Sequence, residues 1–599
     1  MPARLTLEDV EATAKAYADA DFNVHVAAKT LGITVSALRY RLINMRNDHP
    51  HLHLPRAKKT ASLRDTPDED LQEALNEWTK NNFNIYATAR AMGVSVGTIR
   101  YRLGAAERKQ LTPTIRGRSE AQKPRTLKLP KRGKVSRYIL TCAQNDTFLD
   151  DQTWDALQAL AKHYDATVMV STLTYLHSLE GSAKRGTARV VKDSMWYDPR
   201  IEPFVSDEMV ELAPGLVWNG NTNITPTAVE PLSGYDNYNF RASSIFPHVK
   251  VAMKSVPTVR QDAAKLQFTT GTVTKRNYIQ KKAGQKAEFD HVYGGLLVEV
   301  NSSGDWWVRQ LSVDSDGGLY DLDLYVATDG TITKHSGVEA LQFGDIHVAQ
   351  MEQDQLKATW APGGMVDALK PKYQFMHDLL DFESRSHHNM RDPFKMFELH
   401  ARGRESVRRE LEEVAHFLTL TTHCHPSEIV VVQSNHDEHF ERWLRDTSWK
   451  SDPINAELHS AATMAWLAAI REGTGFNALR WGLAHVGAEP EVLTWADPDA
   501  GFVILKDHTG GVEMGLHGDK GPNGSRGSLR NLSRIGRKVC IGHAHAAGII
   551  NGAYQSGVKA KLGMDYAKGS PSSWSQSDIV VYPNAKRTIV TWWGSKYRA

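Results

Sequence analysis

Short apolar segments in the C-terminal part of this chain lead into short motifs that contain histidine, aspartate or asparagine. EIVVVQ runs into residues 434–437 (SNHD), KVCI runs into residues 542–545 (GHAH), and a further apolar segment precedes residues 345–347 (DIH). Apolar runs of this length predict buried strands, and the polar residues after them predict loops at the strand ends. The sequence therefore predicts strands that deliver polar side chains to the loops that follow them.

Two further segments extend this set, residues 377–381 (HDLLD) and 516–519 (LHGD). In chain order the motifs are D-x-H, an aspartate, N-H-D, H-G and G-H-x-H, which supply ligands for two metal ions side by side. Two divalent cations about 3.5–4 Å apart acidify a bridging water and clamp phosphoryl oxygens. Imidazole with carboxylate and amide oxygen suits Mn, Fe, Zn or Ni, whereas an all-oxygen set suits Mg or Ca. We therefore expect a binuclear transition-metal site.

Over roughly residues 340–599, these motifs resemble those of the calcineurin-like metallophosphoesterases, in the same order. The resemblance implies a four-layer α/β/β/α sandwich and hydrolysis of a phosphate ester by a hydroxide that bridges two metals. The ligands implied for one metal are Asp345, His347 and His545, and those for the other are Asn435, His517 and His543. The resemblance also implies that Asp378 bridges the metals and that His436, with Asp437 beside it, protonates the leaving oxygen. General acids of this kind contribute about 10²–10⁴-fold.

The sequence departs from the family pattern at two positions, where His377 and Ser434 replace glycine. The first departure leaves open whether Asp378 or Asp381 is the bridge, and we favour Asp378 because it directly follows the apolar stretch 373–376. The cofactors we expect are two divalent ions, Mn²⁺ first, with Mg²⁺, Fe²⁺, Zn²⁺ and Ni²⁺ as alternatives. Residues 387–389 (HHN) either contact substrate or form a solvated loop, and His439 is left outside the site.

Length and cysteine usage restrict the class of protein. At 599 residues the chain is too long for one hydrophobic core. No apolar run approaches the roughly 20 residues of a membrane span, and the N-terminus has no apolar signal segment. The three cysteines, Cys142, Cys424 and Cys540, are too scattered for a disulfide framework. We expect a cytoplasmic protein with no membrane partner.

Positive charge is concentrated at the N-terminal end. The net charge is only +3, but residues 1–137 contain 25 Lys and Arg against 14 Asp and Glu. Residues 108–137 alone contain 11 basic residues and a single acid, Glu120. A segment with so little apolar content is predicted to be a flexible arm. Its charge favours contact with a polyanion, with Lys131 and Arg132 as candidate phosphate contacts.

The first hundred residues contain a repeat with a spacing of 61. FNV at 22–24 returns as FNI at 83–85, and LRYRL at 38–42 returns as IRYRL at 99–103. Each copy predicts a helix, a glycine turn and a second helix capped by Thr34 or Ser95. The copies resemble the short Fis-type helix-turn-helix, which implies DNA contact by four arginines: Arg39, Arg41, Arg100 and Arg102. The alternative is a pair of helical hairpins used for self-association.

Together these features predict a multidomain α/β protein. Its predicted parts are two small all-α helix-turn-helix units (1–60 and 61–107), a basic linker (108–137), an α/β accessory domain (138–340) and a metallophosphoesterase catalytic domain (341–599). Segment 138–340 begins as β-α-β, continues as a mostly antiparallel sheet and carries no catalytic constellation. His291 within it is interpreted as a structural histidine.

The predicted function is a metal-dependent DNA nuclease. The arrangement is similar to phage-encoded metallophosphoesterase nucleases, including early DNA-degrading proteins of large tailed phages. That similarity implies a homo-oligomer acting on DNA in the cytoplasm of a bacterial host. Two alternatives stay open: a phosphatase or small-nucleotide phosphodiesterase localised by the repeats, and a DNA-bound regulator with an inert catalytic domain. The motifs do not distinguish endonuclease from exonuclease action.

Overall fold

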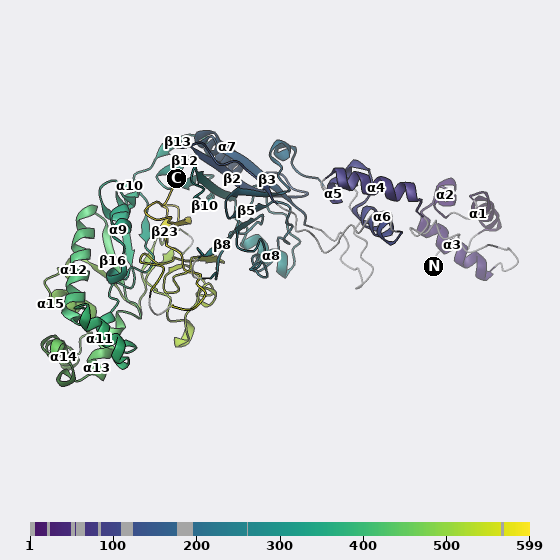
Figure 1. The fold of residues 1–599 in the computed structure, drawn as a ribbon. Helices are drawn as coiled ribbons and strands as arrows, with labels where there is room; N and C mark the ends of the chain where they lie inside the picture. The colour runs from purple at the N-terminus through teal and green to yellow at the C-terminus, as the bar shows by residue number, and fades with distance from the viewer. Residues whose placement is uncertain are drawn as a thin grey trace. The chain divides into compact units, whose positions relative to one another are not determined.

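The computed structural model describes residues 6–20, 24–48, 54, 66–81, 85–109, 124–175, 196–259, 262–508, 510–564 and 568–599. The chain divides into two compact units, Met1–Ala121 with Val191–Asp193, and Gln122–Val190 with Ser194–Ala599. In its described residues the first unit is helical, whereas the second is mixed α/β with four sheets (Figure 1). A search of the described residues finds no helix with the length and apolar character needed to cross a membrane.

The first unit contains two similar groups of three helices. They are α1 (Leu7–Asp19), α2 (Val24–Thr30) and α3 (Val35–Asp48), then α4 (Asp68–Lys80), α5 (Ile85–Ala91) and α6 (Val96–Arg108). Gly32 and Gly93 have φ of 65° and 63°, a left-handed conformation that ends a helix at little cost for glycine. The Thr34 hydroxyl accepts a hydrogen bond from the amide of Ala37 at 3.1 Å and caps the next helix. The predicted glycine turns are confirmed.

The second unit begins with the predicted β-α-β segment. Strand β2 (Val135–Gln144) pairs in parallel with β3 (Thr167–Leu173), and α7 (Asp151–Tyr164) connects them. Strands β9 (Gly294–Asn301) and β10 (Trp306–Ser312) extend this sheet in the order β10-β9-β2-β3. Helix α7 buries its apolar side, including Leu157 and Leu160, against one face of the sheet. A small three-stranded sheet follows: β11 (Leu319–Asp321), β12 (Leu324–Val326) and β13 (Ile332–Lys334).

The histidine motifs follow strands of two other sheets. The six-stranded sheet has the order β17-β16-β15-β14-β23-β24. Its strands are β14 (Ala340–Gln342), β15 (Tyr373–Met376), β16 (Glu428–Val432), β17 (Thr494–Ala496), β23 (Ser577–Val581) and β24 (Arg587–Thr591). Strands β14 to β17 are mutually parallel, so their carboxyl ends lie at one edge. Three of the predicted motifs leave the sheet at that edge.

An eleven-stranded sheet combines strands from both halves of the second unit. Its order is β1 (Arg125–Thr126), β4 (Met209–Ala213), β5 (Leu216–Asn219), β6 (Ser243–Phe246), β8 (Lys265–Thr269), β7 (Met253–Val256), β21 (Gly548–Ile550), β22 (Ala553–Gln555), β20 (Lys538–Ile541), β19 (Val512–Glu513) and β18 (Val503–Ile504). The pairing of β21 with β7 joins segments that the sequence analysis places in separate domains. The division of the chain into five parts stays a prediction.

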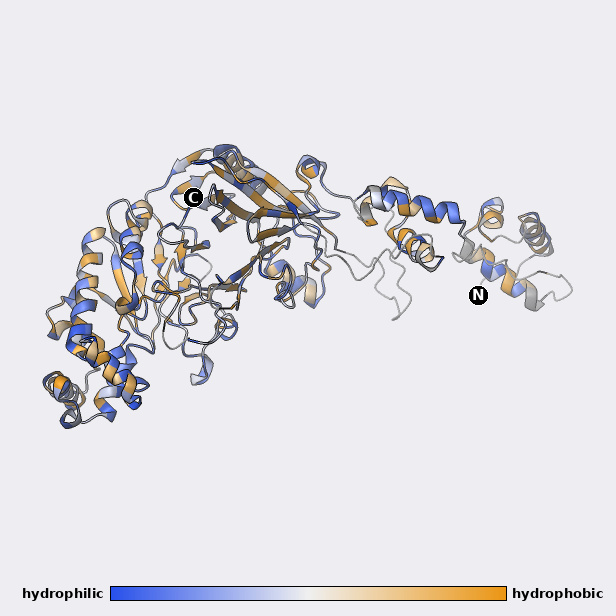
Figure 2. Ribbon diagram, in the orientation of Figure 1, coloured by the Kyte–Doolittle hydropathy of each residue, from blue (hydrophilic) through white to orange (hydrophobic). Residues whose placement is uncertain are grey.

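Strand β16 shows how the layers are held together. Its side chains alternate, so that Ile429 and Val431 pack in a core with helices, while Val430 and Val432 pack against the other sheets. The apolar colouring of strands in Figure 2 agrees with this burial on both faces. The six-stranded sheet therefore lies between a helical layer and a second sheet layer.

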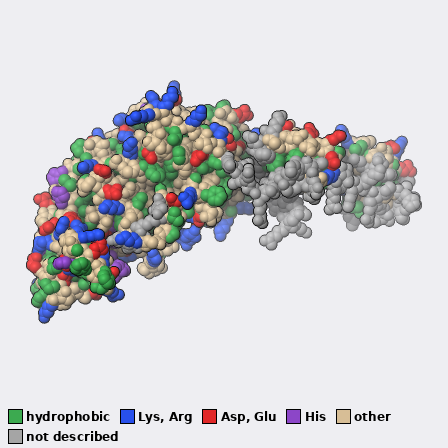
Figure 3. Space-filling model, viewed as in Figure 1, with side chains coloured by type: hydrophobic (Ala, Val, Ile, Leu, Met, Phe, Trp, Pro, Cys, Tyr) green, Lys and Arg blue, Asp and Glu red, His purple; other side chains and the backbone are tan. Residues whose placement is uncertain are grey.

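The helical layer consists of α9 (Gln353–Trp360), α10 (Met365–Leu369), α11 (Pro393–Ala401), α12 (Val407–Cys424), α13 (Glu438–Asp446), α14 (Ala456–Glu472) and α15 (Ala478–His485). Helices α11 and α12 are separated by a short turn in which Gly403 has φ of 64°. Two short helices lie elsewhere: α8 (Lys282–Phe289) and α16 (Leu529–Leu532). Acidic and basic side chains are interspersed on the face of the second unit in Figure 3.

Candidate metal centre

The predicted ligands lie in strained loops directly after strands. Four of them have backbones in the left-handed region, which residues other than glycine rarely adopt. Their φ values are 45° for His347, 49° for Asp378, 73° for His543 and 55° for His545. Non-glycine residues in this region cost of order 1–3 kcal/mol and persist where the surrounding structure imposes them, commonly at functional sites. Four such residues in one place point to a site under functional constraint.

The first group of ligand atoms joins three segments of the chain. Nε2 of His347 lies 3.1 Å from Nε2 of His545 and 3.5 Å from Oδ2 of Asp378. Nε2 of His545 in turn lies 3.3 Å from Oδ2 of Asp345. Ligand atoms of His347, Asp378 and His545 all lie within 4.8 Å of one another, a spacing that suits one cation.

The second group lies on the other side of Asp378. Nε2 of His517 is 3.0 Å from Oδ1 of Asn435 and 3.6 Å from Oδ1 of Asp378. Nδ1 of His543 is also 3.0 Å from Oδ1 of Asn435. Asp378 therefore directs one carboxylate oxygen toward each group, as a ligand shared by two ions must.

Two carboxylates of this site lack the hydrogen bonds that buried charges require. Both oxygens of Asp345 and both oxygens of Asp378 are buried without a hydrogen bond. An unpaired buried carboxylate is costly, so such groups normally pair with a cation or coordinate a metal. The donor set of imidazole, carboxylate and amide oxygen fits divalent transition metals.

The electrostatics of the histidines agree with this interpretation. Burial lowers the pKa of His517 to about 4, and it also lowers the pKa values of His543 and His545. Burial raises the pKa of Asp345, and the neighbouring charge of Asp378 adds to the rise. Burial opposes ionisation of Asp378 as well, but the surrounding imidazoles, His517 first, lower its pKa overall. The lowered pKa values of the three histidines favour the neutral imidazole, which is the form in which histidine binds metal.

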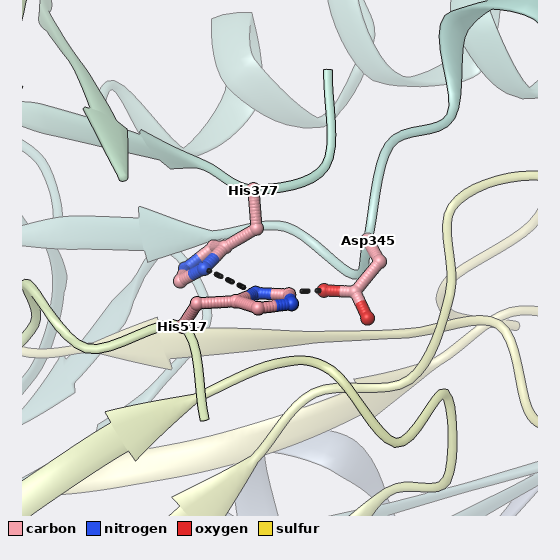
Figure 4. A group of neighbouring side chains, drawn as sticks. All are labelled: Asp345, His377 and His517. Carbon is pink, nitrogen blue, oxygen red and sulfur yellow. Dashed lines mark hydrogen bonds and ion pairs between the residues drawn. The ribbon is translucent and has the colours of Figure 1, made fainter. Parts of the chain in front are cut away.

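His377 is a member of the site that the sequence analysis left out. Its Nδ1 lies 3.3 Å from Nδ1 of His517, and His517 lies 4.0 Å from Oδ1 of Asp345 (Figure 4). Ligand atoms of these three residues also lie within 4.8 Å of one another, and Nε2 of His377 is buried without a partner. The sequence feature that could have indicated His377 is the presence of a histidine, directly after β15, where the family pattern has glycine.

Asp381 has a different place from Asp378. Its Oδ1 lies 3.2 Å from Nδ1 of His347 and 3.5 Å from Nδ1 of His436. It therefore contacts two imidazoles on their Nδ1 sides instead of lying between the two ligand groups. Burial lowers the pKa of His436, but the charges of Asp378 and Asp381 and the bond to Asp381 outweigh it and raise the pKa to about 10.

Asp437 connects two loops of the site. Its carboxylate accepts hydrogen bonds from the Ser434 hydroxyl at 2.9 Å and from the amide of Leu380 at 3.2 Å. Burial, together with the charge of Asp378, raises the pKa of Asp437 to about 7. Ser434 stands where the family pattern has glycine. Its hydroxyl donates one of these two hydrogen bonds, which a glycine could not do.

A cavity of about 410 Å³ adjoins the site on the side of residues 387–389, and its lining includes His388, Asn389, His436 and His439. The ring of His439 lies 5.2 Å from that of His436 and 5.1 Å from that of His387. The polar cluster 387–389 and His439 thus lie beside the site, outside the two ligand groups.

The four predicted DNA-contacting arginines differ in exposure. Arg39 and Arg100, at equivalent positions of the repeat, are exposed. The second arginine of each copy forms an ion pair with an acid of the preceding helices: Arg41 with Asp9 at 4.0 Å, and Arg102 with Asp70 at 3.5 Å. The repeat therefore preserves an ion pair as well as an exposed arginine.

Lys131 and Arg132 are exposed in the loop before β2. Residues 110–123 of the predicted basic arm lie outside the described residues. The described end of the arm contributes β1, which pairs in parallel with β4 at the edge of the eleven-stranded sheet. This part of the predicted arm is held by backbone hydrogen bonds.

This chain is similar in sequence to a known phage protein. Neither a family model nor a solved structure matches the chain. Protein A1 of Escherichia phage T5 is 35% identical over 481 residues, which cover 78% of this chain and 84% of that protein. At this identity and coverage, the chain belongs to the family of phage T5 Protein A1.

Proposed function

We propose that this protein is a metal-dependent DNA nuclease whose six-stranded sheet, facing sheet layer and helices form a metallophosphoesterase sandwich. The observation that carries the proposal is the arrangement of two ligand groups around Asp378, whose buried oxygens, like those of Asp345, lack hydrogen bonds. The relation to a phage protein supports a role in an infected bacterium. A homo-oligomer in the host cytoplasm stays a prediction.

The residues assigned to the ions follow the two groups. Asp345, His347 and His545 would hold one ion, and Asn435, His517 and His543 the other. Asp378 would bridge them, and His377 is placed to contribute on the side of Asp345 and His517. When bound, two divalent cations activate water and neutralise charge on the phosphoryl oxygens.

His436 is assigned as the general acid. Asp378 and Asp381 raise its pKa to about 10, so the imidazole carries a proton at neutral pH. Because Nδ1 lies toward Asp381, Nε2 is the atom that donates to the leaving sugar oxygen. Asp381 holds the ring in this orientation, and Asp437 fixes the loop that carries it.

DNA is favoured over a small phosphate ester by the N-terminal repeat. Arg39 and Arg100 are exposed at equivalent positions, and Lys131 and Arg132 are exposed near the start of the second unit. Lysine and arginine side chains that neutralise phosphates supply the sequence-independent part of DNA affinity. The metal ligands themselves do not distinguish DNA from a nucleotide.

The test compares cleavage of circular and linear duplex DNA with hydrolysis of bis-p-nitrophenyl phosphate, in Mn²⁺, Mg²⁺ or EDTA. Asp378→Asn should abolish both activities. His436→Ala should reduce DNA cleavage by about 10²–10⁴-fold and affect the small ester much less, because p-nitrophenolate leaves without a proton. The matched control is His416→Ala, at an exposed position on α12.

Metal-dependent cutting of the circle would establish endonuclease action. Hydrolysis of the small ester without any cutting of DNA would contradict the nuclease and favour a small-nucleotide phosphodiesterase. DNA binding without turnover of either substrate would favour an inert regulator.

A further inference from the structure

A second cavity, of about 540 Å³, opens directly onto the metal centre. Its lining includes Asp378, Asn435, His436, His543 and His545, which belong to the centre. It also includes Arg526, Arg530 and Trp574, for which the mechanism above has no role. A basic and aromatic wall beside a phosphoesterase centre has the chemistry that binds a nucleotide, since arginine pairs with phosphate and an indole stacks on a base.

Arg526 is placed by a tight hairpin that follows His517. The amide of Gly527 donates to the carbonyl of Asp519 at 2.7 Å, and the amide of Gly521 donates to the carbonyl of Ser525 at 2.7 Å. A side chain at Gly527 would collide with the hairpin, because its Cβ would lie 1.9 Å from the carbonyl oxygen of Gly518. Arg526 itself is exposed, and within the described part of the chain no carboxylate forms an ion pair with it. Its charge is therefore available to an anion in the cavity.

Arg530 lines the same cavity but already has a partner. Its guanidinium forms an ion pair with Glu230. This pair compensates its charge, so Arg530 offers less to a phosphate than Arg526 does. Arg526 and Arg530 line the same cavity but differ in charge environment, so that the effects of substituting them can be compared directly.

Trp574 is fixed against a residue of the metal centre. Its ring centroid lies 4.5 Å from that of His545 at an angle of 68°. The indole also packs on the apolar cluster of Val558, Ala560 and Met564. The amide of Ser575 donates to the carbonyl of His545 at 3.0 Å, which locks the two segments side by side. A rigid aromatic ring held in this way can stack on a base at low entropic cost.

We propose that Arg526 and Trp574 bind the nucleotide next to the scissile phosphate, Arg526 through its phosphate and Trp574 by stacking on its base. Stacking needs an unpaired base, so the preferred substrate is a single strand or a duplex that opens at the site. The inference rests on the proposed nuclease function and adds its substrate class. It predicts that substitution of these residues impairs cleavage of oligonucleotides more than hydrolysis of small phosphodiesters.

The test uses the full chain with Mn²⁺ and measures kcat/KM on a single-stranded tetranucleotide and on bis-p-nitrophenyl phosphate. Arg526→Ala should lower kcat/KM for the tetranucleotide at least about tenfold, as expected for a charge-assisted hydrogen bond. Trp574→Leu should lower it by about 5- to 150-fold through loss of stacking, whereas Trp574→Phe should retain most of it. In both variants the loss on the small ester should be smaller than the loss on the tetranucleotide, because the ester has no second phosphate for Arg526 and no nucleobase for Trp574.

Two arginine variants serve as controls. Arg530→Ala should have a smaller effect than Arg526→Ala, and Arg534→Ala, at an exposed position outside the cavity, should have none. Arg526→Ala should also reduce the slope of log kcat/KM against log salt by about 0.7, the value for one phosphate contact on a single strand. A purely structural role would not change this slope.

Binding separates this inference from the proposed function. Anisotropy of a labelled tetranucleotide, measured in the Asp378→Asn background, should show the same order of affinities without turnover. Equal affinities in all variants, or equal losses on both substrates, would overturn the inference while wild-type cleavage of DNA stands. If the wild type hydrolyses neither substrate, the proposed function fails, and the binding series still decides whether Arg526 and Trp574 hold a nucleotide.

Discussion

Among single residues, two aspartates three positions apart make different contacts in the candidate centre. Asp378 directs its oxygens toward both ligand groups, whereas Asp381 contacts the Nδ1 atoms of His347 and His436. Both follow the same strand and are close in the sequence, so spacing alone left the bridge open. The backbone of Asp378, with φ of 49°, turns its side chain into the site.

The difference between the aspartates predicts a change in the pH dependence of DNA cleavage. Asp381→Asn removes a carboxylate that raises the pKa of His436, so this acid should lose its proton at lower pH than in the wild type. The alkaline limb of the kcat profile should therefore move to lower pH, with two metals still bound. Metal content and a kcat profile on an oligonucleotide test this. Loss of both metals in Asp381→Asn would instead make Asp381 a ligand.

A histidine outside the centre predicts how stability depends on pH. His291 is buried, with Nδ1 2.7 Å from the Tyr278 hydroxyl and Nε2 3.0 Å from the carbonyl of Thr274. These contacts support its interpretation as a structural histidine. Burial lowers its pKa to about 3, so the unfolded chain takes up the proton first as the pH falls. The fold should therefore be most stable above the pKa that His291 has in the unfolded chain. Between pH 7 and pH 5 the free energy of unfolding should fall by about 2 kcal/mol.

The comparison with His291→Gln isolates this effect. The variant should be less stable than the wild type at pH 7, and the difference in Tm should narrow as the pH falls to 5. A difference that stays constant over this range would contradict the assignment.

Among the elements, the two arginines in each copy of the repeat differ in their environment. In each copy the helix after the glycine turn presents one exposed arginine and pairs the other with an acid. The acids occupy equivalent positions in α1 and α4, so the ion pair has the same spacing of 61 as the rest of the repeat. The exposed arginines are therefore the better candidates for phosphate contact.

This difference predicts that substitutions of the exposed arginines and of the ion-paired arginines affect DNA binding unequally. The double variant Arg39→Ala, Arg100→Ala should weaken binding of a duplex and reduce the slope of log K against log salt by about 0.9 for each phosphate that the variant no longer neutralises. The pair Arg41→Ala, Arg102→Ala is the matched control and should change the slope less. Fluorescence anisotropy over a salt series measures both. Unchanged DNA affinity in the first variant, with altered sedimentation, would favour the self-association alternative.

At the scale of the whole molecule, two compact units share one chain, and the candidate metal centre lies entirely in the second. The buried carboxylates of that centre, which lack hydrogen bonds, destabilise the metal-free fold. Metal binding should therefore stabilise one unit and leave the other unchanged.

Calorimetry should show this as two transitions, of which Mn²⁺ raises only one. At a concentration of about 100 times Kd, one bound ion adds about 2.7 kcal/mol to the stability of the unit that binds it. EDTA should reverse the shift, and Asp378→Asn should not show it. An equal rise of both transitions would contradict a centre confined to the second unit.

Features that depend on near neighbours in the chain could be predicted from the amino-acid sequence. The glycine turns and caps of the repeat, the β-α-β segment and the strands before the histidine motifs follow from local periodicity and turn chemistry, and the structure confirms them. The order of the motifs also indicated a shared metal site. Long-range contacts could not be predicted in this way and became visible in the fold: the pairing of β21 with β7, the contact of His377 with His517, and the different contacts of Asp378 and Asp381. These contacts join residues far apart in the chain, or depend on a single backbone dihedral, and neither leaves a periodic signal in the sequence.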